Sequence, residues 1–153
     1  MTILGIDPGF ARMGCAVLEK GKIIYSTCLT SDKNLSQEKR LLSLGKKVEE
    51  IIKKYNPDVL AIEKIFFGKN QKTALQISEV RGMIFYLAAS KKIPIKEFTP
   101  LQVKISLTGY GRAEKQQVQK MVQVILKTKE MSKQDDEIDA IAIALTCSSC
   151  LHV

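Results

Sequence analysis

Four acidic residues stand where apolar segments end or begin, and their oxygens could bind a divalent cation. Asp7 directly follows the apolar run ILGI and precedes a Pro-Gly turn, and Glu63 ends the apolar run VLAI. Asp136 and Asp139 lie one helical turn apart on a shared face, at the start of a segment that becomes apolar all round. Because ligand sites in open α/β sheets lie outside the carboxyl ends of strands, we expect the four carboxylates to meet there.

Such a group of acids suits magnesium better than zinc. Neighbouring carboxylates repel one another unless a cation neutralises them, and Mg²⁺ is commonly held by a few carboxylates, waters and substrate phosphate. Two Mg²⁺ ions can activate a water for in-line attack on a phosphodiester, which would leave a 5′-phosphate and a 3′-hydroxyl. Cys147-x-x-Cys150 followed by His152 could be half of a zinc site, but a second ligand pair is hard to find. We predict two Mg²⁺ ions per active site, with Mn²⁺ able to substitute.

Each acid also has a structural explanation. Aspartate before Pro-Gly is a common turn residue, which would account for Asp7. Acidic residues in a first helical turn interact favourably with the helix dipole, but this explains less well why Asp139 persists among Ile and Ala. Glu63 is harder to explain structurally, because an acid that ends a strand has no helix to cap. Asp135 is adjacent to Asp136, so either of these two could be the third acid of the site.

Composition and charge narrow the class of protein. The 153 residues are 45% hydrophobic and 26% charged, which predicts one globular domain over residues 1–153. The net charge of +8 suits a polyanionic partner, although a Lys-rich surface would give the same value. The sequence contains no run of eighteen apolar residues, so we expect no membrane span. The N-terminus lacks the basic start of a signal peptide. The cysteines show no secreted disulfide pattern, so we expect a cytoplasmic protein.

The hydrophobic pattern predicts the elements that must position the acids. Turn signals separate three early strands, and a helix then ends where Asn56 precedes a proline. Strands alternate with helices from there on, which predicts an α/β fold with a mixed five-stranded sheet and helices on both faces. This is the element order of the RNase H-like fold. The expected strands cover residues 3–7, 13–19, 22–29, 58–62 and 95–98, and the expected helices cover 36–55, 72–89, 100–109, 113–127 and 133–147.

Five short motifs occur in one order along the chain: GIDPG from Gly5, AIE from Ala61 with Phe66 after it, RG from Arg81, GYGRAEK from Gly109 and DEIDA from Asp136. Together they resemble the RuvC family of bacterial crossover junction endodeoxyribonucleases over essentially the whole chain. The resemblance implies a homodimer that resolves four-way (Holliday) DNA junctions by symmetric nicking of two opposing strands, in homologous recombination and DNA repair. It also implies preference for a short cognate sequence and cooperation with a branch-migration motor of the RuvA and RuvB type.

The resemblance assigns roles to single residues. Asp7, Glu63, Asp136 and Asp139 match the four metal-binding acids of the family. Phe66 matches an aromatic residue that stacks on bases near the crossover, although Phe66 or its neighbour Phe67 could belong to the core. Lys104 and Lys115 match DNA-contacting residues, and Lys115 could orient the phosphate or the attacking water. Further plausible phosphate contacts, which could equally be solvated surface residues, are Lys64, Lys69, Lys72 and Arg112. The helix over 72–89 is the expected dimer interface.

Three other functions remain open for a sequence of this kind. An actin-like sugar or acetate kinase also has a phosphate loop that begins Gly-Ile-Asp, but it needs two such domains, which 153 residues cannot supply. A non-catalytic junction-binding module would keep the fold without the chemistry, and retention of all four acids argues against it. A related enzyme with the same metal chemistry, acting on RNA or on another branched substrate, is the third alternative.

Overall fold

The computed structural model describes residues 1–65, 71–128 and 134–151, with the side chains of residues 71 and 72 excepted. Its centre is a five-stranded sheet in the order β3-β2-β1-β4-β5. Strand β2 pairs antiparallel with both β1 and β3, and β4 and β5 extend the sheet in parallel from β1. The predicted mixed sheet is therefore confirmed. The strand bounds are β1 Thr2–Asp7, β2 Arg12–Glu19, β3 Lys22–Thr30, β4 Val59–Glu63 and β5 Ile95–Phe98.

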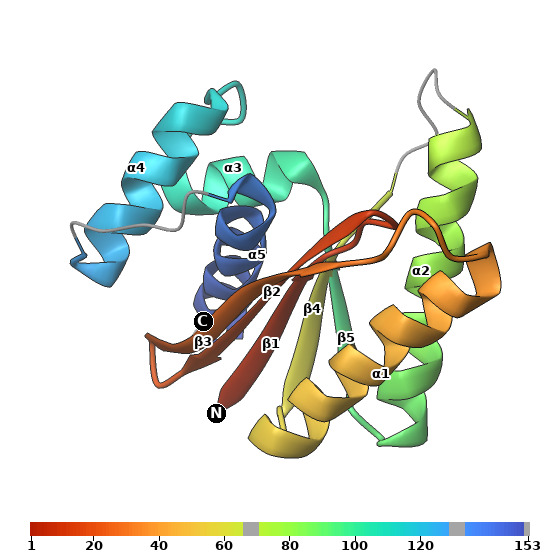
Figure 1. The fold of residues 1–153 in the computed structure, drawn as a ribbon. Helices are drawn as coiled ribbons and strands as arrows, with labels where there is room; N and C mark the ends of the chain where they lie inside the picture. The colour runs from red at the N-terminus through yellow and green to blue at the C-terminus, as the bar shows by residue number, and fades with distance from the viewer. Residues whose placement is uncertain (66–70, 129–133, 152–153) are drawn as a thin grey trace.

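Helices cover both faces of the sheet, as predicted (Figure 1). Helices α1 and α2 pack on one face, and α5 packs on the other with α3 and α4 beside it. Side chains along β1 alternate between the two faces, so that Ile3 is buried under α5 whereas Leu4 and Ile6 are buried under α1 and α2. The helix bounds are α1 Gln37–Tyr55, α2 Gln71–Ser90, α3 Pro100–Thr108, α4 Lys115–Leu126 and α5 Asp135–Leu151.

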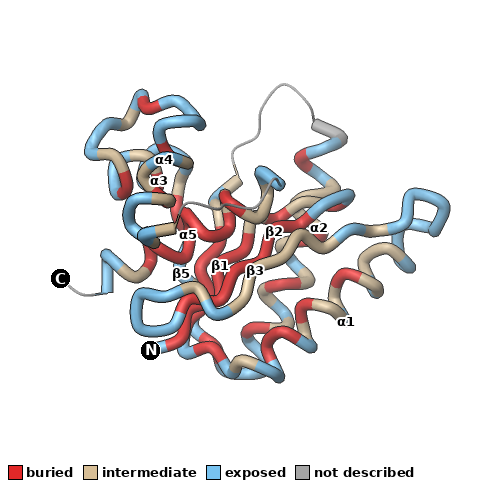
Figure 2. The backbone as a smooth tube through the Cα atoms, turned by 60° about the vertical axis from the view of Figure 1, so that its left-hand side comes forward, coloured by how far each residue is buried: buried red, intermediate tan, exposed pale blue. Residues whose placement is uncertain are grey.

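Helix α5 is buried along most of its length (Figure 2), and it lies directly on two glycines of the sheet. A Cβ atom on Gly5 would lie 2.4 Å from the Ala140 carbonyl oxygen, and one on Gly14 would lie 1.7 Å from the Asp136 carbonyl oxygen. Such distances leave no room for any side chain. The glycines of β1 and β2 therefore fix the height of α5 above the sheet, and with it the position of the helix N-terminus.

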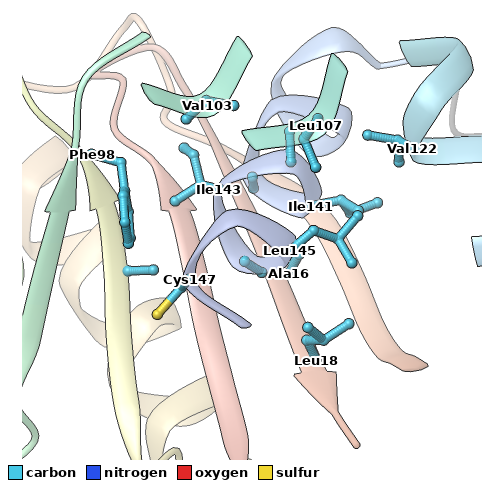
Figure 3. Close-up of a cluster of buried hydrophobic side chains, with 14 of the residues drawn as sticks. Ala16, Leu18, Phe98, Val103, Leu107, Val122, Ile141, Ile143, Leu145 and Cys147 are labelled. Atoms are coloured by element: carbon cyan, nitrogen blue, oxygen red, sulfur yellow. The ribbon is translucent and has the colours of Figure 1, made fainter. Parts of the chain in front are cut away.

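A compact core joins α5 to its neighbours (Figure 3). Ile143 of α5 points toward Val103 of α3 and Phe98 of β5, while Leu145 lies over the strands near Ala16. The predicted third helix is confirmed with its start and stop, since Thr99 caps the N-terminus of α3 and Gly109 ends it. This core positions α3 and α4 beside the carboxyl ends of the strands.

Two expectations about helices need correction. Helix α5 runs to Leu151 rather than ending at residue 147, which places Cys147 in the core and Cys150 at the surface as free thiols. The helical spacing of the sequence predicts a buried stripe on α2 through Ala74, Ile77, Arg81, Phe85 and Ala88. Ala74 and Ala88 are buried as expected, but between them the buried residues are Val80 and Ile84, and residues 77, 81 and 85 are only partly buried. The reason is that α2 carries apolar residues on several faces, so periodicity gives the helix but not the side that it buries.

Among the helices that the structure describes, none is both long enough and apolar enough to span a bilayer.

Candidate active site

Two neighbouring strands bring the first pair of acids together at the upper edge of the sheet in Figure 1. Parallel strands β1 and β4 pair in the register Ile6 to Ile62, so Asp7 and Glu63 follow side by side at the strand ends. Burial, and next the charge of Glu63, raises the pKa of the Asp7 carboxyl to about 7. Burial and the charge of Asp139 likewise raise the pKa of Glu63. The carboxylates therefore repel one another in a partly desolvated place.

The N-terminal turn of α5 adds the third and fourth acids from the other side. Asp139 accepts a hydrogen bond from Lys115 Nζ at 2.9 Å, and burial nevertheless raises the pKa of its carboxyl. Asp139 and Asp136 both act on the pKa of Asp7, which shows that their charges reach the strand-end pair. The acids of β1, β4 and α5 therefore act on one another's pKa at this edge of the sheet, and their joint metal binding stays a prediction.

The structure distinguishes Asp136 from Asp135. The Asp135 side chain is 64% exposed, lies 3.4 Å from Lys115 Nζ and accepts a hydrogen bond from Gln119. The Asp136 side chain is 30% exposed, and its charge contributes to the raised pKa of Asp7. Of the two, Asp136 is the less exposed acid and the one whose charge acts on Asp7, and its role as the third acid of the site stays a prediction.

The four acids do not form a closed set of metal ligands as they stand. Within residues 1–65, 71–128 and 134–151, no three His, Cys, Asp or Glu side chains are grouped closely enough to hold an ion. Cations engage two of the acids instead: Arg12 Nη2 lies 2.6 Å from Asp136, and Lys115 binds Asp139. The donor set nevertheless fits a hard cation, because its ligands are all carboxylate oxygens and three of them have a raised pKa. A bound ion would relieve that repulsion.

A cavity of about 190 Å³ opens beside the acids. Glu63 and Asp139 line one side of it, Lys104 and Lys115 contribute two amines, and the remaining wall is apolar. Partial burial acts to lower the pKa of Lys115, but the hydrogen bond and charge of Asp139 outweigh it, so the pKa lies above its ordinary value. Lys115 is therefore a cation at neutral pH, which suits it to hold a phosphate oxygen.

The structure places some predicted DNA contacts and leaves others outside its description. Lys64 is exposed directly after β4, Lys104 is half-buried on α3, and Arg112 is exposed in the loop before α4. Phe66, Phe67, Lys69 and His152 lie outside the described residues, as does the side chain of Lys72.

Two arginines that support the site were not predicted from the sequence. Arg12, the first residue of β2, pairs with Asp136. Arg81 of α2 donates hydrogen bonds to the Glu63 carbonyl oxygen and to the Glu97 carboxylate, and its side chain is only 12% exposed. The Arg81-Gly82 motif marked this position without indicating a role. For Arg12, nothing local in the sequence indicates its distant partner.

Comparisons with known proteins agree with this geometry. The family model of "Crossover junction endodeoxyribonuclease RuvC" matches residues 3–147. A protein of that name from Caldanaerobacter subterraneus subsp. tengcongensis is 46% identical over 150 residues, which cover 95% of this chain and 90% of the relative. The structure of Thermus thermophilus RuvC superposes with a TM-score of 0.91 at 28% identity, covering 99% of this chain and 96% of that one. The same protein in complex with a Holliday junction substrate gives a TM-score of 0.90 at 29% identity, with 97% and 93% covered. The chain described here therefore belongs to the RuvC family of crossover junction endodeoxyribonucleases and has its RNase H-like fold.

Proposed function

We propose that this chain is a Mg²⁺-dependent endodeoxyribonuclease that resolves four-way DNA junctions by nicking two opposing strands, in homologous recombination and DNA repair. The observation that carries the proposal is the mutual electrostatic effect of Asp7, Glu63 and Asp139 beside Lys115, in a chain matched by the RuvC model over residues 3–147. This arrangement supplies oxygen ligands for a hard cation and a fixed positive charge for a phosphate. It offers the parts that phosphodiester hydrolysis needs.

The four acids would hold the cation, with Asp7 and Glu63 at the strand ends and Asp136 and Asp139 on α5. When bound there, Mg²⁺ supplies a water of lowered pKa and neutralises charge on the phosphoryl group. Lys115 stays protonated, so it orients the scissile phosphate rather than accepting a proton. The neighbouring cavity would give this reaction centre one apolar wall.

The basic residues around the site would bind the phosphates of the junction. Lys104 and Lys115 line the cavity, and Lys64 follows Glu63 directly along the chain. Together with the net charge of +8, they provide a positive surface next to the acids. We assign Phe66 to base stacking and Lys69, Lys72 and Arg112 to phosphate contacts on family likeness.

A homodimer would supply the two sites that paired nicks require. Leu75 and Tyr86 of α2 are 62% and 73% exposed, and Gly82 lies between them on the same helical stripe. We define these three residues as the α2 stripe. An exposed stripe with large apolar residues at its ends and a glycine in the middle suits close packing against a second copy. Cooperation with a branch-migration motor of the RuvA and RuvB type belongs to the same proposal.

The direct test is strand cleavage of a synthetic mobile four-way junction with Mg²⁺. The Asp7→Asn variant, linear duplex and RNA–DNA hybrid are run alongside it. Paired symmetric nicks in the junction alone, lost in the variant, would support the proposal. Equal cleavage of the hybrid would indicate a related nuclease with another substrate, and tight junction binding without cleavage would indicate a binding module.

A further inference from the structure

Arg12 makes a contact that the proposed mechanism does not use. Its guanidinium Nη2 lies 2.6 Å from Asp136 Oδ2, and the Cys28 thiol donates to the same oxygen at 3.9 Å. The Arg12 side chain is 51% exposed, so the pair lies at the surface of the site. One of the acids expected to bind a metal is therefore occupied by a positive charge from the chain itself.

We propose that Arg12 is an exchangeable counter-ion of this site, which holds Asp136 until a divalent cation takes the carboxylate and which then binds a DNA phosphate. The inference rests on the proposed metal-dependent function, because it assigns Asp136 two successive partners. It makes Arg12 a positioning residue for the metal site and a phosphate contact for the junction.

The exchange follows from the strength of the competing interactions. An ion pair between exposed side chains is weak, because water screens it and two side chains must be ordered. A divalent cation at the acids attracts the Asp136 carboxylate more strongly and repels the neighbouring guanidinium. Arg12 would then turn toward solvent, where its planar fork of donors fits a phosphate.

The surroundings of Arg12 suit an anion. Arg12 and Arg40 both line a cavity of about 430 Å³ together with Gly9. The Arg40 guanidinium lies 4.1 Å from the centroid of the Phe10 ring and donates to Ser31 Oγ at 3.0 Å, so a second cation is already held at this place. Arg12, which contacts an acid, thus shares a cavity with a second arginine, and we assign this cavity to a backbone phosphate of the cut strand.

A structural role for Arg12 would be to fasten α5 to the sheet, and the packing argues against it. The Asp136 backbone rests on Gly14, and the helix is held by its buried apolar residues. Removal of Arg12 therefore leaves α5 where it is. A structural role predicts weaker metal and DNA binding together, whereas an exchangeable counter-ion predicts changes of opposite sign.

The test uses Arg12→Gln in the full chain, with Lys53→Gln as a matched control. Lys53 also forms an exposed ion pair, 3.1 Å from Glu49 on α1, but lies away from the acids. Mn²⁺ binding without DNA is followed by electron paramagnetic resonance, and junction binding by fluorescence anisotropy in Ca²⁺ at several salt concentrations. We expect R12Q to bind Mn²⁺ about threefold more tightly and the junction about threefold more weakly, with the salt slope reduced by about one. The control should match the wild type in both, and Arg12→Lys should restore part of the junction affinity.

Opposite shifts in the two affinities would support the inference. Weaker binding of both ligands, or Mn²⁺ affinity equal to that of the wild type, would overturn it while leaving the proposed function intact. If the Asp7→Asn and Asp139→Asn variants bind Mn²⁺ as tightly as the wild type, the proposed metal site itself is wrong.

Discussion

Helices α5 and α2 flank the same sheet from opposite faces, but they are buried to very different extents. Between Ile138 and Cys147 every residue of α5 except Asp139 is buried, whereas α2 leaves Leu75 and Tyr86 open to solvent. Helix α5 approaches the sheet so closely that glycines must lie beneath it. Helix α2 keeps large side chains on both its inner and outer sides. The first helix fixes distances within the chain, and the second presents a surface outward.

This difference would let one small fold combine the proposed chemistry with the proposed dimer. The acids on α5 must keep their distance from Asp7 and Glu63, so a helix with no freedom to move suits them. A surface for a second copy needs exposed apolar side chains, which α2 has. Substitutions on α5 should therefore change the reaction or the folding, and substitutions on the outer side of α2 should change association.

The largest effect is expected from Asp139→Asn on α5. The loss of one charged ligand should lower the rate of junction cleavage by about a thousandfold, an effect of the size seen when a group that stabilises transition-state charge is removed. Single-turnover cleavage with saturating enzyme measures it. Glu49→Gln on α1, which removes an acid paired with Lys53 outside both helices, is the control and should cleave normally. A rate within tenfold of the wild type for D139N would contradict the assignment.

The same substitution at two glycines should have opposite effects on stability. Gly14→Ala would place a methyl group 1.7 Å from the Asp136 carbonyl, so α5 must shift and the free energy of unfolding should fall by about 2–4 kcal/mol. Gly82→Ala on α2 meets no atom within 4 Å and should stabilise the monomer by about 0.5–1 kcal/mol. Urea unfolding at a concentration that keeps both variants monomeric measures the two values. Equal effects would mean that α5 can move after all.

Association should depend on the outer side of α2. Tyr86→Glu places a charge on the α2 stripe and should raise the dimer dissociation constant at least about tenfold, while the monomer keeps its fold. Analytical ultracentrifugation gives the constant. Val124→Glu changes a residue on α4 that is 66% exposed and should leave association unchanged. A dimer that tolerates Y86E would place the interface elsewhere.

The smallest effect concerns the pH dependence of stability without metal. Because the pKa of Asp7 is about 7 in the folded chain and 3.8 ordinarily, the folded state holds a proton that the unfolded state loses between these values. Wild-type stability in EDTA should therefore fall as pH rises from 4 to 7. The Asp7→Asn variant does not lose stability in this way, so at pH 8 it should be more stable than the wild type by about 1–2 kcal/mol. This value is smaller than the full pKa shift of Asp7 would give, because the carboxyl is partly solvated.

Thermal unfolding of both proteins across this pH range gives the difference, which should vanish below pH 4. Addition of Mg²⁺ at pH 8 should raise the melting temperature of the wild type more than that of the variant. An advantage of D7N that is independent of pH would show that its cause is not the charge of Asp7.

The sequence predicted the sheet and the strand-end acids well because their signals are local. Asp7 and Glu63 each end an apolar run, and Asn56 ends α1 in the left-handed conformation just before a proline. The register of parallel strands then brings the two acids together without further information. The end of α5 was less predictable, because the polar residues Ser148 and Ser149 resemble a helix stop although the helix continues through them.

The remaining parts of the site depend on contacts between distant segments. The pair of Arg12 with Asp136 joins the start of β2 to α5, and no spacing rule connects them. The bond from Arg81 to the Glu63 carbonyl similarly requires knowledge of how α2 lies against β4. Periodicity also cannot say which side of an all-round apolar helix faces inward. These features follow from packing and from side-chain reach rather than from local pattern.

Arg81 connects helix α2 to the acids at the ends of the strands. It belongs to the helix whose outer side we assign to a second copy, yet its guanidinium bonds to the backbone of Glu63, an acid that we assign to the metal site. A displacement of α2 on association would move this donor, so assembly and cation binding become linked equilibria. Linkage is reciprocal: whatever factor association contributes to cation affinity, the cation contributes to association. In such a chain the affinity of each site for its cation would rise when the dimer forms. The two sites of a dimer would then become competent for cleavage together.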